Sequence, residues 1–141
     1  MKNSNFYTLK GYKLKEKQEL TDAMEDYLEM ISRYLKTNDF ITIKELSQKL
    51  NVKPSSVSKM ANKLKETGFI NFQKYGNITL TTEGIKKGNF LLWRHKILKN
   101  FFKFINKDNY KLDQVEKVEH FIDNITLKNI ELFLKKFEKK S

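Results

Sequence analysis

Residues 51–64 read NVKPSSVSKMANKL and contain the turn and the last helix of a predicted helix-turn-helix. Residues 51–53 form the turn, and Pro54 suits the first turn of a new helix, where the missing N–H of proline costs nothing. Before them, Thr42 and Glu45 have the spacing of a capping box, which predicts the start of another short helix. Two short helices joined by a tight turn are typical of a helix-turn-helix.

A further helix is predicted in front of this unit. Its apolar residues recur at helical spacing and form one stripe, which contains Met24, Tyr27, Leu28, Ile31 and Leu35. The helix is expected to begin near Thr21 or Asp22, with Asp22 and Glu25 as a capping pair, and to end near residues 37–39.

Two short strands are predicted after the helix-turn-helix. Residues 70–72 and 78–80 alternate apolar and polar side chains, and Gly76 between them can adopt the positive φ of a tight turn. We expect this hairpin to be a wing, so that residues 20–82 form a winged helix-turn-helix DNA-binding domain.

The rest of the chain predicts three more helices, over about residues 82–104, over about residues 112–123, and from Thr126 onward. The last two are short and strongly apolar on one side. Two interpretations of these faces remain open, namely packing against the long helix or a dimer interface. The expected fold is mostly α, with the winged domain followed by a small helical metal-binding and dimerisation domain over residues 83–141. Residues 1–19 are expected to be a basic N-terminal arm.

The composition limits the partners of the chain. The 141 residues carry a formal net charge of +11, which favours a polyanionic partner, most simply double-stranded DNA. A general enrichment in lysine would give the same charge. No apolar run is long enough to span a bilayer and no signal peptide is evident, so we expect a cytoplasmic protein without membrane contact. The absence of Cys excludes thiolate metal sites.

The outward residues of the helix that begins at Pro54 are candidates for DNA contacts. Short polar side chains can bond base edges and phosphates, and lysines supply charge. The candidates are Ser55, Ser56, Ser58, Lys59, Asn62 and Lys63 on this helix, with Lys74 on the wing. The alternative is that these residues are only a solvated polar face.

Both histidines of the chain accompany carboxylates. Glu116, Glu119 and His120 stand at i, i+3 and i+4 of a predicted helix, so they share one face. Asp26 and Glu29 share a face of the first helix in the same way.

With His95 from the long helix, this set contains four carboxylates and two imidazoles, and four negative charges would neutralise two divalent cations. Oxygen and nitrogen ligands without sulfur suit Mn²⁺ or Fe²⁺ and tolerate Co²⁺, Ni²⁺ and Zn²⁺. The alternative is an ordinary solvated helix face, with His95 in the core.

These stretches resemble the manganese-transport-regulator branch of the diphtheria-toxin-repressor family. The resemblance covers about residues 20–135 and rests on residues 24–29 (MEDYLE), 52–60 (VKPSSVSKM), 75–76 (YG), 80–81 (LT), 94–95 (RH) and 115–120 (VEKVEH). It implies a homodimeric repressor of metal-uptake genes with a binuclear site between the DNA-binding and dimerisation helices. The ligands that it implies are Asp26, Glu29, His95, Glu116, Glu119 and His120. Iron-type members carry Met and Cys in place of Asp26 and Glu116, so the set is similar to the manganese type.

The chain departs from the family pattern in three places. Residues 1–19 have no counterpart in the shortest manganese-type members, so the role of the arm is open. Lys99 stands where iron-type members place an ancillary carboxylate ligand, which argues against that second type of site. The chain ends at Ser141 without the C-terminal β-domain of the iron type, so we expect a smaller or differently arranged dimer interface.

The predicted function is a transcription repressor in which Mn²⁺ or Fe²⁺ orders the dimer for operator binding. We expect no catalytic activity and no small organic cofactor. One alternative is a winged-helix regulator that does not sense metal. Another is a di-metal carboxylate enzyme, but such enzymes repeat a Glu-x-x-His pair. Here Leu92 stands three residues before His95, and Lys117 stands three residues before His120.

Overall fold

The structure is a computed structural model that describes residues 20–73 and 76–138. The elements in chain order are α2 (Asp22–Tyr34), β1 (Ile41–Thr42), α3 (Ile43–Leu50), α4 (Pro54–Glu66), β2 (Ile70–Phe72), β3 (Asn77–Leu80), α5 (Thr82–Asn106), the 3₁₀ turn η1 (Lys107–Asn109), α6 (Leu112–Val118), the 3₁₀ turn η2 (Glu119–Phe121) and α7 (Asn124–Glu138). The predicted N-terminal arm and Lys74 lie outside the described residues. Within the two described ranges, no helix combines the length and the apolar character that a bilayer crossing requires.

The predicted winged helix-turn-helix is confirmed. The side chain of Thr42 accepts a hydrogen bond from the backbone N–H of Glu45, and the Glu45 carboxylate accepts one from the backbone N–H of Thr42, so the capping box opens α3. Asn51 ends α3 in the left-handed region at φ 55°, and Pro54 is the first residue of α4. α3 and α4 are therefore joined by the short turn that the sequence predicts.

The wing belongs to a sheet of three strands in the order β1-β3-β2. β2 and β3 form the predicted antiparallel pair, in which Ile70 lies opposite Leu80. β1 was not predicted and pairs with the other edge of β3, where Ile41 lies opposite Ile78. This short strand joins the start of α3 to the base of the wing.

α2 begins at Asp22, as predicted, but its cap differs from the prediction. Thr21 caps the helix, because its side chain accepts a hydrogen bond from the backbone N–H of Met24. The predicted capping pair of Asp22 and Glu25 is therefore wrong, and Glu25 is available for a contact elsewhere in the molecule.

The DNA-binding domain is built around an apolar core that includes α2. Completely buried side chains from α2, α3, α4 and the sheet meet there, among them Leu28, Ile31, Ile41, Leu64 and Ile78. Because α2 shares this core with α3 and α4, the position of α2 determines the position of the helix-turn-helix.

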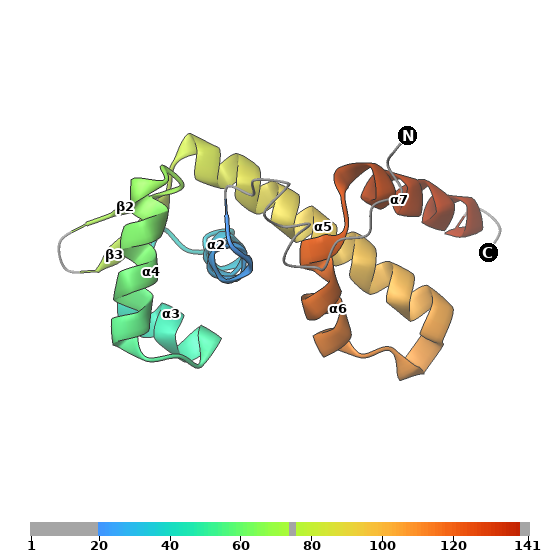
Figure 1. The fold of residues 1–141 in the computed structure, drawn as a ribbon, viewed down its shortest axis with the longest axis horizontal. Coiled ribbons are helices and arrows are strands. Elements are labelled where there is room, and N and C mark those ends of the chain that lie inside the picture. Colours follow the sequence, from blue (N-terminus) through green and yellow to red (C-terminus); the bar gives the residue numbers. More distant parts are fainter. Residues whose placement is uncertain (1–19, 74–75, 139–141) are drawn as a thin grey trace, which may run out of the picture.

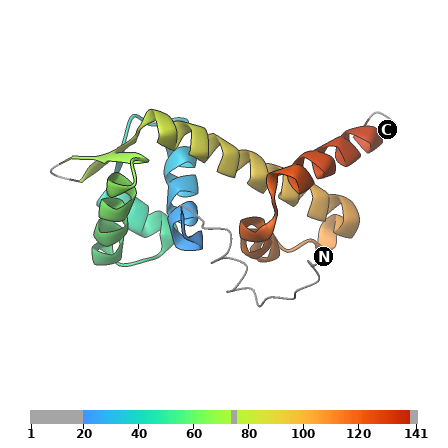
Figure 2. The ribbon, with the colours of Figure 1, turned by 45° about the horizontal axis from the view of Figure 1, so that its top comes forward.

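The long helix α5 connects the two halves of the molecule (Figure 1) and crosses α2 (Figure 2). Its close approach to α2 requires Gly88, since a Cβ at this position would lie 1.8 Å from Oγ of Ser32. One turn earlier, a Cβ on Gly84 would lie 1.9 Å from the carbonyl oxygen of Phe69. Both glycines allow the first half of α5 to pack directly on the DNA-binding domain.

The C-terminal half contains a second, smaller core. The buried residues from α5, α6 and α7 that form it are Ile97, Leu98, Val115 and Leu127. The short C-terminal helices thus pack against the long helix, as one of the two interpretations expected. α7 begins at Asn124, two residues before the predicted start.

The helix predicted over residues 112–123 is shorter than expected. It ends at Val118 and is followed by a 3₁₀ turn, so Glu119 and His120 do not continue the α-helical face of Glu116. Their side chains nevertheless reach the same region, because the turn directs them back toward α2 and α5.

Candidate metal centre

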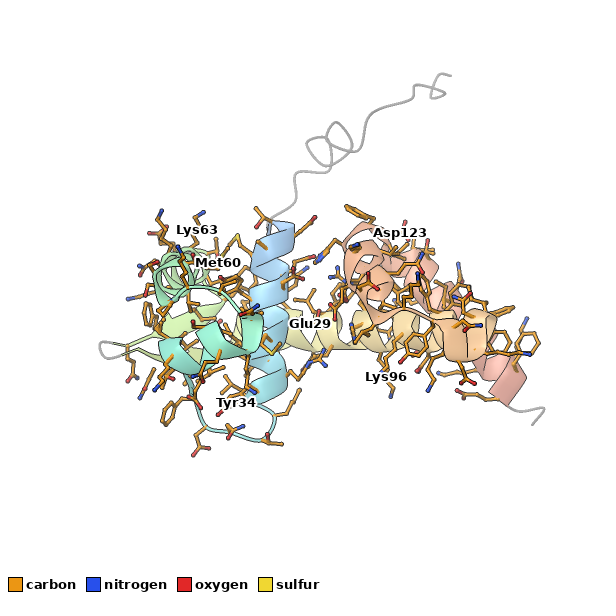
Figure 3. All side chains as sticks on the ribbon, turned by 90° about the horizontal axis from the view of Figure 1, so that it is seen from below. Glu29, Tyr34, Met60, Lys63, Lys96 and Asp123 are labelled. Carbon is orange, nitrogen blue, oxygen red and sulfur yellow. The ribbon has the colours of Figure 1, made fainter. Side chains whose placement is uncertain are left out.

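Three elements bring the predicted metal ligands together between the DNA-binding domain and the C-terminal helices. α2 contributes Asp26 and Glu29, α5 contributes His95, and α6 with the following turn contributes Glu116, Glu119 and His120. Figure 3 shows Glu29 on the side of α2 that faces α5 and the C-terminal helices.

The first group of potential ligand atoms is mostly buried. Glu29, His95, Glu116 and Glu119 each offer one atom, and these atoms all lie within 4.8 Å of one another. Nδ1 of His95 lies 3.3 Å from Oε1 of Glu119 and 3.7 Å from Oε2 of Glu29. Glu116 is exposed, so the group reaches the surface on the side of α6.

A second group adjoins the first. Asp26, Glu119 and His120 each offer one potential ligand atom, and these three atoms also lie within 4.8 Å of one another. Nε2 of His120 lies 3.0 Å from Oδ1 of Asp26. Glu119 belongs to both groups, so all six predicted residues are brought together in two adjoining sets.

Glu119 has the surroundings of a carboxylate that binds a cation. Its side chain is 0% exposed, and its Oε2 has no hydrogen-bond partner among the described residues. Burying an unpaired carboxylate oxygen is costly, and a bound cation would supply the missing partner. The surrounding donors are carboxylate oxygens and imidazole nitrogens, which fit a divalent cation of hard or borderline character.

The clustering changes the protonation of the candidate ligands. Burial and the neighbouring Glu119 carboxylate raise the pKa of Glu29 to about 7, against the opposite effect of His95. The hydrogen bond to Glu119 raises the pKa of His95. Burial lowers the pKa of His120, but hydrogen bonds to two carboxylates outweigh it and raise this pKa to about 10. Without metal, the centre therefore holds protons near neutral pH that compete with a cation.

Two charged residues that the sequence analysis did not assign to the site support His120. Nδ1 of His120 donates to Oε1 of Glu25 at 2.8 Å, and Nη2 of the buried Arg94 donates to the same oxygen at 3.2 Å. A metal-binding imidazole commonly donates its second N–H to a carboxylate, which fixes the ring. Glu25 and Arg94 thus position His120 with Nε2 facing Asp26. Asp22 joins Glu25 and His120 in a third group of carboxylate and imidazole atoms.

The predicted DNA-contacting side chains lie along α4. Ser58 is half-buried, and the exposed ones are Ser55, Ser56, Lys59, Asn62 and Lys63. Figure 3 shows Lys63 on the far side of α2 from Lys96 and Asp123. This polar, basic face is therefore open to a nucleic acid and separate from the candidate metal centre.

Known protein families match both halves of the chain. Residues 19–78 match the iron dependent repressor, N-terminal DNA binding domain, and residues 81–141 match the iron dependent repressor, metal binding and dimerisation domain. An uncharacterised HTH-type transcriptional regulator of Methanocaldococcus jannaschii is 36% identical over 124 residues, which are 86% of this chain and 99% of that relative. The chain belongs to the diphtheria-toxin-repressor family of metal-dependent transcription regulators.

Within the diphtheria-toxin-repressor family, the chain is similar to the manganese-transport-regulator branch. The HTH-type transcriptional regulator MntR of Bacillus pumilus is 36% identical over 103 residues, which are 72% of each chain. Membership of a family of transcription regulators also excludes the alternative of a di-metal carboxylate enzyme.

Solved structures of the diphtheria-toxin-repressor family have the same fold. A manganese-dependent transcriptional repressor in complex with manganese has a TM-score of 0.67 and 26% identity, and the match covers 79% of this chain and 52% of that one. ScaR with bound Zn²⁺ has a TM-score of 0.66 and 26% identity, with 79% of this chain and 53% of that one covered. The chain spans about half the length of these solved repressors.

Proposed function

We propose that the chain represses metal-uptake genes by binding operator DNA when Mn²⁺ or Fe²⁺ occupies a binuclear site. The proposed ligands are Asp26, Glu29, His95, Glu116, Glu119 and His120. The observation that carries the proposal is the position of Glu119, which is completely buried and belongs to both groups of ligand atoms. One carboxylate shared by two adjoining groups suits a pair of ions.

The donor set favours the proposed metals. Four carboxylates and two imidazoles without sulfur suit Mn²⁺ and Fe²⁺. By the Irving–Williams order, Co²⁺, Ni²⁺ and Zn²⁺ should bind at least as tightly as Mn²⁺. Selectivity must then depend on which ion the geometry of the centre accepts in the conformation that binds DNA.

A bound cation would supply positive charge and bonds that join carboxylates of α2 to those of α6 and η2. Without it, Glu29 and Glu119 repel one another across these elements. α2 and α4 pack in the same core, so holding α6 against α2 also fixes the position of α4, the helix proposed to contact DNA. In a dimer, the two α4 helices must match major-groove half-sites about one helical turn or a multiple apart. Metal and DNA binding are coupled in this proposal because both favour the same arrangement.

We propose double-stranded DNA as the partner of the α4 face. Lys59 and Lys63 would neutralise phosphates, and the short side chains of Ser55, Ser56, Ser58 and Asn62 would approach base edges. Lys74, which lies outside the described residues, remains the proposed contact of the wing. The net charge of +11 supports the same partner.

We propose that the second copy of the chain binds at an aromatic cluster formed by the end of α5 and by α7. Phe104, Phe133 and Phe137 are 42%, 40% and 43% exposed, which is unusual for adjacent large apolar side chains. The ring centroids of Phe133 and Phe137 lie 4.8 Å apart, and those of Phe104 and Phe133 lie 5.8 Å apart. A preformed aromatic surface of this kind is typical of the centre of a homodimer interface.

The Phe133→Asp variant is expected to be monomeric. A charge placed in the middle of the aromatic cluster should raise the dissociation constant of the dimer by about 30-fold or more. Sedimentation velocity over a range of concentrations measures this effect. Ile85→Asp is the matched control, because Ile85 is 49% exposed on α5 and lies outside the cluster. A Phe133→Asp protein that dimerises like the unaltered chain would place the interface elsewhere.

Mn²⁺ binding is expected to strengthen as the pH rises from 6 to 8. His120 has a pKa of about 10, so over this whole range it must release the proton on Nε2 before that nitrogen can bind a metal. Glu29 has a pKa of about 7, so metal binding releases a proton from its carboxyl group mainly below pH 7. Each released proton makes the dissociation constant fall by about tenfold per pH unit, so the slope is steeper below pH 7 than above it. Calorimetry in buffers of different ionisation enthalpy counts the protons. Affinity independent of pH in this range would contradict the protonated centre.

The same two groups determine how the stability of the metal-free protein depends on pH. Both pKa values are raised by folding, from 4.5 for Glu29 and 6.5 for His120. The stability that these groups contribute is therefore complete below their unfolded values and is lost as the pH rises through about 7 for Glu29 and about 10 for His120. Added metal should oppose this loss.

The experiment that tests the proposed function is the selection of sites from a duplex DNA library with and without Mn²⁺ at one fixed salt concentration. We expect sequence-selective binding only with Mn²⁺. Selective binding of equal strength in both conditions would retain the DNA-binding regulator and contradict metal control. Binding without sequence preference in both conditions would contradict operator recognition.

A further inference from the structure

Arg33 in the last turn of α2 holds one of the proposed ligands. Its Nη2 donates to Oε2 of Glu29 at 2.8 Å. The side chain of Arg33 is 50% exposed, whereas that of Glu29 is 7% exposed. An exposed cation is thus bonded to an almost buried carboxylate of the candidate centre.

The oxygen that Arg33 binds is the one that faces the centre. Oε2 of Glu29 lies 3.7 Å from Nδ1 of His95, and this nitrogen also lies 3.3 Å from Oε1 of Glu119. The guanidinium therefore occupies one bonding direction of a potential ligand atom and adds positive charge beside the place where a cation would bind.

Arg33 also lines an approach to the centre from solvent. A cavity of about 300 Å³ is bordered by three proposed ligands, Asp26, Glu29 and Glu116, and by two cationic side chains, Arg33 and Lys49. Nζ of Lys49 lies 4.9 Å from the centroid of the Tyr34 ring. The two cations thus border the same cavity, but among the described residues only Arg33 bonds an oxygen of a proposed ligand.

We propose that Arg33 competes with the metal for Glu29 and so raises the metal concentration at which the regulator binds DNA. The proposal rests on the metal-binding function proposed above. Arg33 acts as an internal substitute for part of the metal charge, and an ion entering the site must displace its hydrogen bond or weaken it. Arg33 therefore sets the metal concentration needed for DNA binding, while the metal ligands stay the same.

The simpler explanation of this contact is an ordinary i,i+4 ion pair on a helix surface. Such a pair stabilises the helix slightly and has no effect on a neighbouring site. The two explanations differ in their consequence for metal affinity, because only competition predicts that removal of the guanidinium makes binding tighter.

The test compares Mn²⁺ binding by calorimetry in the full chain and in three variants, at one pH and one ionic strength. Arg33→Met removes the charge and the donor but keeps an unbranched side chain, and we expect its Mn²⁺ dissociation constant to fall about threefold to tenfold. Arg33→Lys keeps the charge and should stay close to the unaltered chain. Lys49→Met removes a charge from the same cavity without removing a ligand contact, and its dissociation constant should change by less than about twofold.

Each result decides the question. Tighter binding in Arg33→Met alone supports competition. Unchanged or weaker binding in Arg33→Met overturns it, because Arg33 would then be neutral or would hold Glu29 in its binding position. Equal tightening in Arg33→Met and Lys49→Met also overturns it, since general electrostatics would explain both. No Mn²⁺ binding by the unaltered chain would overturn the proposed function itself, together with this inference, and is distinguishable from the other results.

Discussion

The Glu119→Gln variant is expected to bind Mn²⁺ about 100-fold more weakly, or worse, while remaining folded. Loss of a residue that only supports a ligand typically costs 10- to 100-fold in metal affinity, so loss of a shared ligand should reach or exceed the upper end of that range (about 100-fold). The substitution also removes a buried negative charge that raises the pKa of Glu29. The melting temperature without metal should therefore stay close to that of the unaltered chain.

Calorimetry with Mn²⁺ and thermal unfolding without metal together measure this effect. Glu83→Gln is the matched control, because Glu83 lies on α5, is 70% exposed, and pairs with Lys86 at 3.8 Å. The control should bind Mn²⁺ normally. Mn²⁺ binding of normal strength in Glu119→Gln would mean that Glu119 serves only as a buried partner of His95.

The Gly88→Ala variant is expected to be destabilised by about 1–3 kcal/mol, the usual cost of overpacking a close contact. The added methyl group would lie 1.8 Å from Oγ of Ser32 and 2.7 Å from its Cβ, so α5 and α2 must separate. This cost opposes the higher helix propensity of Ala, which is worth about 1 kcal/mol. Separation would also move His95 relative to Glu29, so Mn²⁺ affinity should fall as well.

Urea unfolding of the metal-free protein measures this loss. The Ser32→Gly substitution removes both atoms that the new methyl group would meet, so the double variant Gly88→Ala/Ser32→Gly should recover most of the stability. A Gly88→Ala protein as stable as the unaltered chain would show that α2 and α5 are not in firm contact. A double variant no more stable than Gly88→Ala would attribute the loss to another cause.

Most of the DNA-binding domain could be predicted from local sequence signals. The capping box at Thr42 and Glu45, the proline at the start of α4 and the alternation on both sides of Gly76 each act over a few residues. β1 could not be predicted because its two residues are too few for a recognisable period. Its formation depends on the free edge of β3, which is far away in the sequence.

The six proposed ligands could be selected because their spacing along the helices and the resemblance to a family agree. The helical spacing predicts the three C-terminal ligands only in part, since α6 ends at Val118 and a 3₁₀ turn carries Glu119 and His120. No Gly or Pro marks this helix end in the sequence. The convergence with α2 and α5 comes from tertiary packing, on which local periodicity gives no information.

The supporting residues of the centre were missed for the same reason. Glu25 has the position of a helix-capping residue in the sequence, and its bonds to His120 and Arg94 join segments that are 95 and 69 residues apart. An Arg directly before a proposed ligand is the signal that the sequence offers, since Arg94 precedes His95. The sequence alone does not indicate which carboxylate forms the ion pair with Arg94.

The continuity of α5 limits how this protein can be recombined with its relatives. Gly84 and Gly88 in the first half of the helix fit the DNA-binding domain, and His95 in the same 25-residue helix belongs to the metal centre. A chimera joined at the end of the wing would pair a foreign α5 with this α2, and any larger side chain in place of Gly88 would collide with Ser32. A junction inside α5, between Gly88 and Arg94, would keep Gly88 with its own Ser32. Asp26 and Glu29 would still stay with the DNA-binding half, so metal preference cannot be exchanged without also replacing α2.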